Sequence, residues 1–261
     1  ISAIEHGGLR DTARALAAQG VEVRELPVDG RGVIRAAALP GLLQDGAALV
    51  SVMAANNETG VIQPVAEIVR LAQAAGVPVH VDATQLAGRL PIDFAALGAR
   101  FVSASAHKLH GPKGVGVLLV KKGAPFVALL PGSQERRRRG GTENLPGIAG
   151  FAVAARLARV YLESGDEMAR QAAMRDALEA GLGEAVPGLR VFGAGAARLP
   201  NTSCLAFGAL DAEIVLARLE KAGICASSGS ACSAGSTDPS HVLLAMGVPE
   251  HEARAAVRFS L

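Results

Sequence analysis

Residues 47–83 read AALVSVMAANNETGVIQPVAEIVRLAQAAGVPVHVDA. The segment opens with an apolar run typical of a buried strand. It continues into a helical pattern that begins at Pro64 and closes at Gly76, and it ends in a second apolar run. Strands that are apolar on both faces and alternate with helices favour a parallel sheet with helices on both faces. This stretch therefore predicts an α/β fold.

The same alternation continues on both sides of the segment. Helical spacing over 9–20 ends in a glycine, and 21–26 then alternates like a strand. Further strand-like runs occupy 99–106 and 114–123. We therefore predict an α/β domain with a mainly parallel sheet over 1–146.

The pattern changes near Pro146. A long Ala-rich helical stretch follows and is interrupted near Gly165, and shorter strand-like and helical runs then fill the sequence to its end. These runs predict a smaller α+β domain over 147–261. Because the sequence opens at Ile1 as if inside a domain and ends at Leu261 on a strand-like run, we expect both domains to be truncated.

The composition indicates an ordered globular protein of moderate charge. Half of the 261 residues are hydrophobic and 19% are charged, which is enough for a sizeable core. Aromatic residues make up only 3%, so a flat ligand has few rings on which to stack. The net charge of +2 argues against a general nucleic-acid surface, and the basic run 136–139 fits a solvated loop.

The cysteine pattern favours a reducing compartment. Cys204, Cys225 and Cys232 form no CxxC pair and no even set, so neither a disulfide framework nor a structural zinc site is expected. No uninterrupted run reaches the roughly 18 apolar residues of a membrane helix, and no signal segment opens the sequence. We predict a cytoplasmic protein that binds neither membranes nor nucleic acid.

Polar side chains follow three of the expected strands. AANNETG (54–60), DATQ (82–85) and SAHK (105–108) each stand at the carboxyl end of a strand. Ligands bind outside these ends in open α/β sheets, so the three segments are expected to face one crevice. Together they offer amide, carboxyl, hydroxyl, imidazole and amine groups.

Lys108 and Asp82 are the residues in this group that indicate a particular chemistry. A lysine at a strand end is usually a solvated rim residue. Lys108, however, follows a buried strand and stands beside His107, where desolvation would lower its pKa and make it a Schiff-base nucleophile. A neighbouring aspartate would keep a heteroaromatic ring nitrogen protonated, so that the ring accepts electrons. A lysine paired with an acid in this way is typical of pyridoxal phosphate sites.

Two other interpretations concern metals and thiols. His80, Asp82, His107 and His110 lack the spacing of a metal-binding motif, so no metal site is predicted. Cys204, and less clearly Cys225, fit small buried hydrophobic residues.

Cys232 has a different setting from the other two cysteines. It stands in SSGSACSAG, where a polar, glycine-flanked loop is a poor site for burial, and this setting favours a reactive thiolate.

Seven segments together resemble a known enzyme family. They run in order along nearly the whole sequence: EHGGLRDTARAL (5–16), NNETGVIQP (56–64), HVDATQLAGRLPID (80–93), SASAHKLHGPKGVG (103–116), RRRRGGTENLPGIAG (136–150), SSGSACSAGSTDPSHVL (227–243) and AVRFSL (256–261). The chain resembles cysteine desulfurases of the NifS/IscS-like group. These enzymes belong to the fold-type I, class V aminotransferase superfamily, which depends on pyridoxal phosphate.

The resemblance implies a role for each matching residue. Lys108 would hold the cofactor covalently, Asp82 would pair with its ring nitrogen and Gln85 would donate to its phenolic oxygen. The remaining residues implied to contact the cofactor or the substrate are Asn57, at the ring substituents or the substrate; Ser105 and His107, at the phosphate; His6, over the ring face; Thr142, at the phosphate of a neighbouring subunit; and Arg258, at the substrate carboxylate.

The implied reaction converts L-cysteine to L-alanine and leaves a persulfide on Cys232. A homodimer and a sulfur-acceptor or iron–sulfur scaffold protein are the implied partners. Three alternatives remain open at this point: a selenocysteine lyase, another class V aminotransferase, and an inactive fragment that serves as a scaffold.

Overall fold

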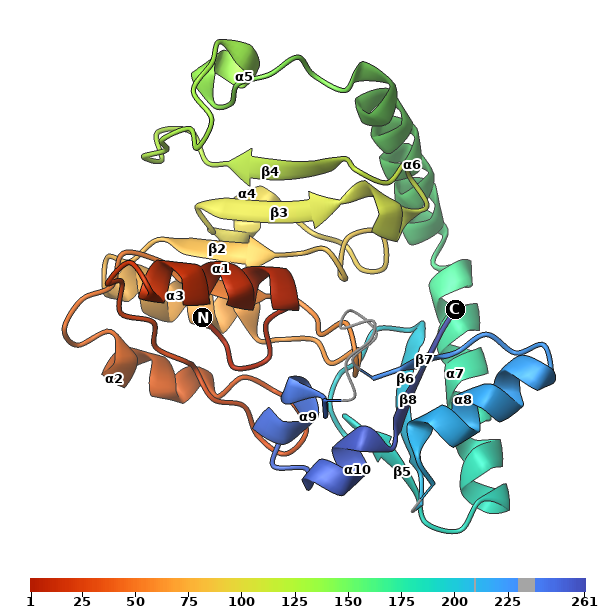
Figure 1. The fold of residues 1–261 in the computed structure, drawn as a ribbon. Coiled ribbons are helices and arrows are strands. Elements are labelled where there is room, and N and C mark those ends of the chain that lie inside the picture. Colours follow the sequence, from red (N-terminus) through yellow and green to blue (C-terminus); the bar gives the residue numbers. More distant parts are fainter. Residues whose placement is uncertain (209, 230–237) are drawn as a thin grey trace.

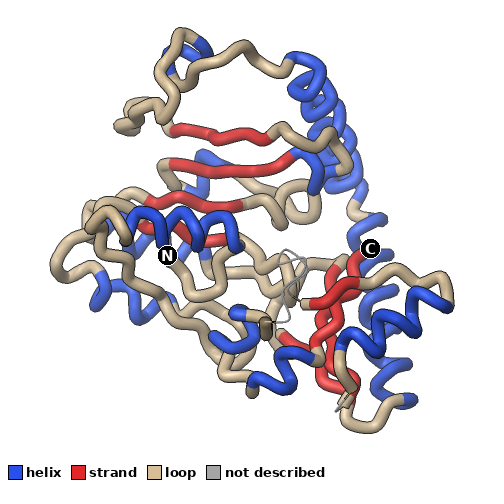
Figure 2. Tube along the Cα trace, viewed as in Figure 1, coloured by secondary structure: helices blue, strands red, loops and turns tan. Residues whose placement is uncertain are grey.

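The computed structural model describes residues 1–208, 210–229 and 238–261, and these residues form two four-stranded sheets (Figures 1 and 2). The first sheet has the order β1-β2-β3-β4 and the second has the order β5-β6-β8-β7. The strands are β1 (Val50–Met53), β2 (Val79–Asp82), β3 (Phe101–Ser105), β4 (Gly116–Val120), β5 (Leu189–Phe192), β6 (Thr202–Phe207), β7 (Ser227–Ser228) and β8 (Ala256–Ser260).

Helices connect and cover these strands. They are α1 (Gly7–Ala17), η1 (Ala36–Ala38), α2 (Leu39–Leu42), α3 (Val65–Ala74), α4 (Phe94–Leu97), η2 (Ala106–Leu109), α5 (Gln134–Arg137), α6 (Leu145–Ser164), α7 (Asp166–Ala185), α8 (Ala212–Lys221), α9 (His241–Ala245) and α10 (Glu250–Arg254), where η marks a 3₁₀-helix.

The first sheet confirms the predicted α/β class. Strands β1, β2 and β3 are parallel, and β4 runs antiparallel to β3. All four residues of β1 are buried, as expected for a strand that is covered on both faces. Helix α3 packs on β1 and β2, and Figure 1 shows α1 in front of the sheet with α3 behind it.

A pair of long helices leads from the first sheet to the second (Figure 1). Helix α6 ends at Gly165, which has a left-handed φ of 74°, and α7 begins at the next residue, so the predicted break is confirmed. Helix α7 packs on β5 and β6. The expected boundary at 146 falls within the first turn of α6, and the division into two domains there stays a prediction.

The prediction of a strand over 21–26 is wrong. This segment makes only one isolated bridge, between Ser2 and Leu26, and Val21 is 48% exposed. A strand needs a partner along its length, but only the short segment around Ser2 lies alongside it. Pro27, which lacks an N–H, also follows immediately.

Helix α6 is long and apolar enough to cross a membrane, judged by length and composition alone, and it is the one such helix among the described residues. The sequence prediction missed it because Arg156, Arg159 and Glu163 interrupt the apolar run. The helix packs against η2 and α7, and its exposed apolar residues include Leu157. A single helix of this composition is weak support for a membrane span, because core helices of other proteins share it.

Candidate functional site

A pocket of about 310 Å³ opens at the carboxyl ends of the three parallel strands. Its walls come from the loops after β1, β2 and β3, from the start of α1 and from β8. The lining residues are His6, Met53, Ala55, Asn57, Asp82, Thr84, Gln85, Ser105, His107, Lys108 and Arg258.

Local structure explains why the functional groups meet here. Asp82 is the last residue of β2 and Ser105 is the last of β3. The chain then turns into η2, whose first residue, Ala106, is fully buried and anchors the helix, while His107 and Lys108 follow on the open side. The structure therefore brings Lys108 and Asp82 to one pocket, and their roles in it remain predictions.

The acid and the imidazoles of the pocket have defined hydrogen bonds. The backbone N–H of Thr84 donates to Asp82 Oδ1 at 2.9 Å, which fixes the carboxylate at the strand end. Ser105 Oγ lies 2.7 Å from His107 Nδ1. Burial and the positive charges of Lys108 and Lys113 lower the pKa of His107, so its neutral form is favoured.

His6 lies at the entrance of helix α1. Its Nδ1 accepts a hydrogen bond from the backbone N–H of Gly8 at 3.2 Å and so caps the helix. The ring also lines the pocket, at an exposed position. The cap gives the ring a preferred orientation at the pocket wall.

Arg258 reaches the pocket from the second sheet. Its Nη1 donates to the backbone oxygen of Asn57 at 3.0 Å, and its Nη2 donates to Ser227 Oγ at 2.9 Å. Its Nε is buried and has no hydrogen-bond partner among the described residues. Each terminal nitrogen carries a second N–H, so the guanidinium group retains donors for a carboxylate.

Two predicted residues do not line this pocket. Thr142 is exposed and borders a separate hollow of about 580 Å³ between β4 and α6. Cys232 lies outside the described residues. Of the other cysteines, Cys204 is fully buried, as predicted, whereas Cys225 is exposed, so the prediction of burial is wrong for Cys225. Cys225 lies in the irregular segment between α8 and β7.

Sequence reasoning missed two residues that shape the site. Ser227 holds Arg258, but the pairing of β7 with β8 that places it there has no local sequence signal. Thr84 of the DATQ motif also lines the pocket, although the sequence indicated roles only for Asp82 and Gln85 of that motif. A hydroxyl between an aspartate and a glutamine at a strand end was the signal that could have found it.

His80 of β2 forms hydrogen bonds with serines of both neighbouring strands. His80 Nδ1 lies 2.7 Å from Ser51 Oγ, and His80 Nε2 lies 3.0 Å from Ser103 Oγ, so the ring links β1, β2 and β3. Burial lowers its pKa. Within the described part of the chain, no three His, Cys, Asp or Glu side chains gather closely enough to hold a metal ion.

A larger hollow, of about 1070 Å³, lies on the other side of η2 and shares Lys108 with the pocket. Apolar residues of α6 such as Val153 and Leu157 form much of its wall. We assign the candidate site to the smaller pocket, because that pocket also holds the carboxylate, the amides and the imidazoles that ligand chemistry requires.

The fold and this pocket define an α/β protein with a lysine and an acid at the ends of neighbouring parallel strands. The family model described as aminotransferase class-V matches residues 1–261, and the chain belongs to this family of pyridoxal phosphate-dependent proteins.

Particular relatives can be named. The chain is 46% identical over 259 residues to the cysteine desulfurase NifS of Azotobacter vinelandii, and this match covers 99% of the chain and 64% of the relative. The chain therefore spans just under two thirds of that relative's length. A solved NifS-like protein superimposes with a TM-score of 0.90 at 37% identity, covering 100% of this chain and 68% of the other. A structure titled SspA in complex with cysteine has a TM-score of 0.82 at 30% identity, and the match covers 100% of this chain and 72% of the other.

Proposed function

We propose that this protein is a pyridoxal phosphate-dependent cysteine desulfurase that converts L-cysteine to L-alanine and passes the sulfur to Cys232. The observation that carries the proposal is the shared pocket of Lys108 and Asp82. Relatives named as cysteine desulfurases, and a structural neighbour whose title places it in complex with cysteine, support the same choice.

The donors of the pocket fit the cofactor. The volume of the pocket, about 310 Å³, is at the lower end of the range for small-molecule sites. Lys108 would hold the cofactor, Asp82 would face its ring nitrogen and Gln85 its phenolic oxygen. Ser105 and His107 offer donors to a phosphate. When bound, pyridoxal phosphate supplies a ring that accepts electrons from the carbon skeleton of an amino acid.

The chain's own groups would do the rest of the work. The carboxylate of Asp82 would hold a proton at the ring nitrogen, and the terminal N–H groups of Arg258 would orient the substrate carboxylate. His6 and Lys108 stand at the pocket wall, where they can move protons.

The Cys232 thiolate would attack the sulfur of the substrate. A sulfur–sulfur bond forms and the carbon–sulfur bond breaks, so cysteine and a thiol become alanine and a persulfide. Atoms and electrons balance in this exchange without a further oxidant.

The proposal also includes a second copy of the chain, a sulfur-acceptor protein and a cellular compartment. Exposed apolar side chains over 127–130, with Val127 at 92% and Leu129 at 94%, lie on the segment that leads to Thr142 and suit a homodimer contact. We also propose an iron–sulfur scaffold or another sulfur acceptor as recipient of the persulfide, and a reducing cytoplasm in which the thiol stays available.

The test is a visible spectrum of the purified protein, followed by addition of cysteine and assay of alanine and sulfide. We expect a cofactor absorbance band, lost in Lys108→Ala, and release of alanine that depends on cysteine. Cys232→Ser should keep the band and lose sulfur release. The matched control is Cys225→Ser, at an exposed cysteine outside the pocket, which should behave as the wild type. A preparation that stays colourless and inert after addition of pyridoxal phosphate would refute the proposal.

A further inference from the structure

The residue after Asn57 faces away from the pocket and is buried. Glu58 is only 3% exposed, and its Oε2 accepts a hydrogen bond of 2.5 Å from Ser240 Oγ. Ser240 is the N-cap of α9, where its Oγ also accepts from the backbone N–H of Leu243 at 3.2 Å. A carboxyl group of the first sheet's loop therefore holds the start of a helix from the C-terminal part of the chain.

Two more segments of the C-terminal part approach the same carboxyl group. A Cβ atom built on Gly229, just after β7, would lie 3.5 Å from Glu58 Oε2. Burial raises the pKa of Glu58 to about 7, and Arg258 of β8 is close enough for its positive charge to offset part of this rise. The backbone oxygen of Asn57, one residue earlier, receives the hydrogen bond from Arg258 Nη1.

The turn that carries Glu58 is held rigidly. The side-chain oxygen of Asn56 accepts hydrogen bonds from the backbone N–H groups of Glu58, at 2.9 Å, and Thr59, at 3.0 Å. Gly60 has a φ of 74°, and a Cβ there would lie 3.1 Å from the Thr202 side chain. These contacts fix the backbone from which the Glu58 side chain projects toward Ser240.

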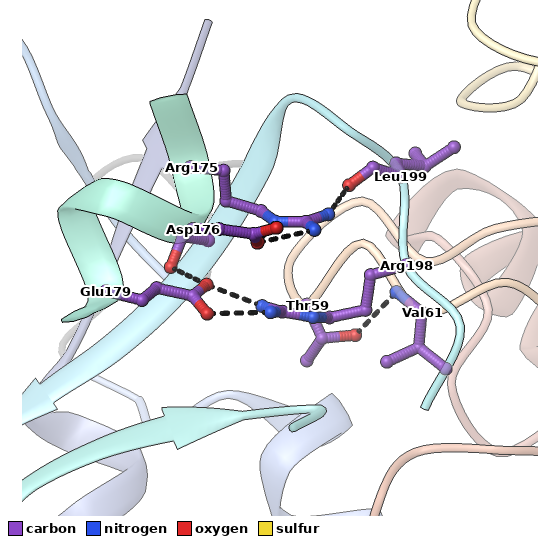
Figure 3. A network of polar contacts seen from close by, with 8 residues as sticks. Thr59, Val61, Arg175, Asp176, Glu179, Arg198 and Leu199 are labelled. Atoms are coloured by element: carbon purple, nitrogen blue, oxygen red, sulfur yellow. Dashed lines mark hydrogen bonds and ion pairs between the residues drawn. The ribbon is translucent and has the colours of Figure 1, made fainter. Parts of the chain in front are cut away.

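The other side of the same turn has a separate set of contacts (Figure 3). Val61 forms an isolated bridge with Arg198, and Arg198 makes two hydrogen bonds of 2.7 Å to the carboxylate of Glu179. The Glu179 carboxylate, which is partly buried, also accepts from Ser203 Oγ at 2.7 Å. It supports the turn without contacting the Arg258 side of it, so it provides a matched control.

We propose that Glu58 is a positioning residue for the substrate carboxylate: by holding the start of α9 and the 56–60 turn together, it keeps Arg258 aimed into the pocket. This inference rests on the proposed function, because it takes the ligand of Arg258 to be an amino acid. Glu58 acts through Arg258 and does not touch the ligand itself, so its effect depends on whether the ligand carries a carboxylate.

The test compares two amines on the protein loaded with pyridoxal phosphate. L-Alanine carries the carboxylate that Arg258 would bind, whereas ethylamine lacks it. Binding of each is followed by the change in visible absorption, and melting of the cofactor-free protein by circular dichroism serves as the fold check. The variants are Glu58→Gln, Ser240→Ala, Arg258→Lys and Glu179→Gln.

We expect Glu58→Gln and Ser240→Ala to weaken L-alanine binding about tenfold, equivalent to about 1.4 kcal/mol, and to leave ethylamine binding within about twofold of the wild type. In an Arg258→Lys background the Glu58→Gln change should have little further effect, because the residue through which it acts is already altered. Glu179→Gln should lower the melting temperature and leave the ratio of the two affinities unchanged.

Three results would overturn the inference: equal weakening of both amines, additive losses in the double variant, or wild-type binding of L-alanine by both Glu58→Gln and Ser240→Ala. If Glu58→Gln fails to fold, Ser240→Ala decides the question alone. Failure of the proposed function looks different, because the wild type would then release no alanine from cysteine, while the comparison of the two amines could still be made.

Discussion

The contribution of Glu5 to the stability of this protein should fall as the pH rises from about 4.5 through about 7. This residue is fully buried between α1 and β1, and its Oε1 accepts hydrogen bonds from Ser2 Oγ and, at 2.9 Å, from the backbone N–H of Met53. Its Oε2 has no partner among the described residues. Burial, as the largest cause, raises the pKa of Glu5 from 4.5 to about 7.

The sign of this pH dependence follows from whether the folded or the unfolded state binds the Glu5 proton more tightly. The folded protein holds the Glu5 proton more tightly than the unfolded chain, so the protonated group contributes its full stability below pH 4.5. That contribution is lost as the pH rises through about 7. At about 1.4 kcal/mol per tenfold change in proton affinity, the loss between pH 5 and pH 8 is roughly 2.5 kcal/mol.

The variant that tests this is Glu5→Gln, which keeps the shape and the Oε1 acceptor but cannot ionise. Urea unfolding followed by circular dichroism gives the unfolding free energy of each protein at each pH. We expect the difference between the variant and the wild type to be about 2.5 kcal/mol more favourable to the variant at pH 8 than at pH 5. Glu179→Gln is the opposite control, since hydrogen bonds from Arg198 and Ser203 outweigh burial and lower the pKa of Glu179, so this variant should lose stability at neutral pH. The reasoning is refuted if Glu5→Gln changes stability equally at both pH values.

Three further predictions concern the turn, the ion pair and the thiols. Gly60→Ala should cost about 1–3 kcal/mol in urea unfolding, because φ is 74° and the new Cβ would lie only 3.1 Å from the Thr202 side chain. Gly20→Ala shares the left-handed backbone, with a φ of 92°, but has nothing within 4 Å and should cost less; equal losses would contradict the packing argument. Arg198→Ala should cost about 1–3 kcal/mol by leaving the partly buried Glu179 with Ser203 Oγ as its remaining side-chain donor, and a loss below about 0.5 kcal/mol would show that solvent compensates for the lost pair. In Cys232→Ser, a thiol reagent should modify Cys225 rapidly and Cys204 only after unfolding, since burial also raises the pKa of the Cys204 thiol; rapid reaction of two thiols in the native protein would contradict the buried position.

The sequence was enough to predict the first sheet, because its strands are marked by local features. Continuous apolar runs, a proline at the start of a helix and glycines at helix ends identify β1, α3 and β2 without knowledge of the rest. The convergence of the polar segments at the strand ends followed from the rule that parallel strands share one edge.

What could not be predicted depends on contacts between segments far apart in the chain. Ser227 holds Arg258 across two paired strands, and Ser240 holds Glu58 across 182 positions of sequence. No local pattern of residues encodes such a pairing. The failed strand over 21–26 has the same origin, because its alternation was correct and its partner strand was lacking.

The 56–60 turn presents consecutive residues to two different surroundings, with Asn57 lining the pocket and Glu58 buried beneath α9. Deleting one residue before Asn57 would bring Glu58 to the position of Asn57 and place a carboxylate in the pocket, whereas inserting one would bring Asn57 to the buried position and remove the partner of Ser240. The number of residues between β1 and Gly60 is therefore fixed as firmly as their identity, and natural variation in length should be confined to segments that contact only one half of the molecule.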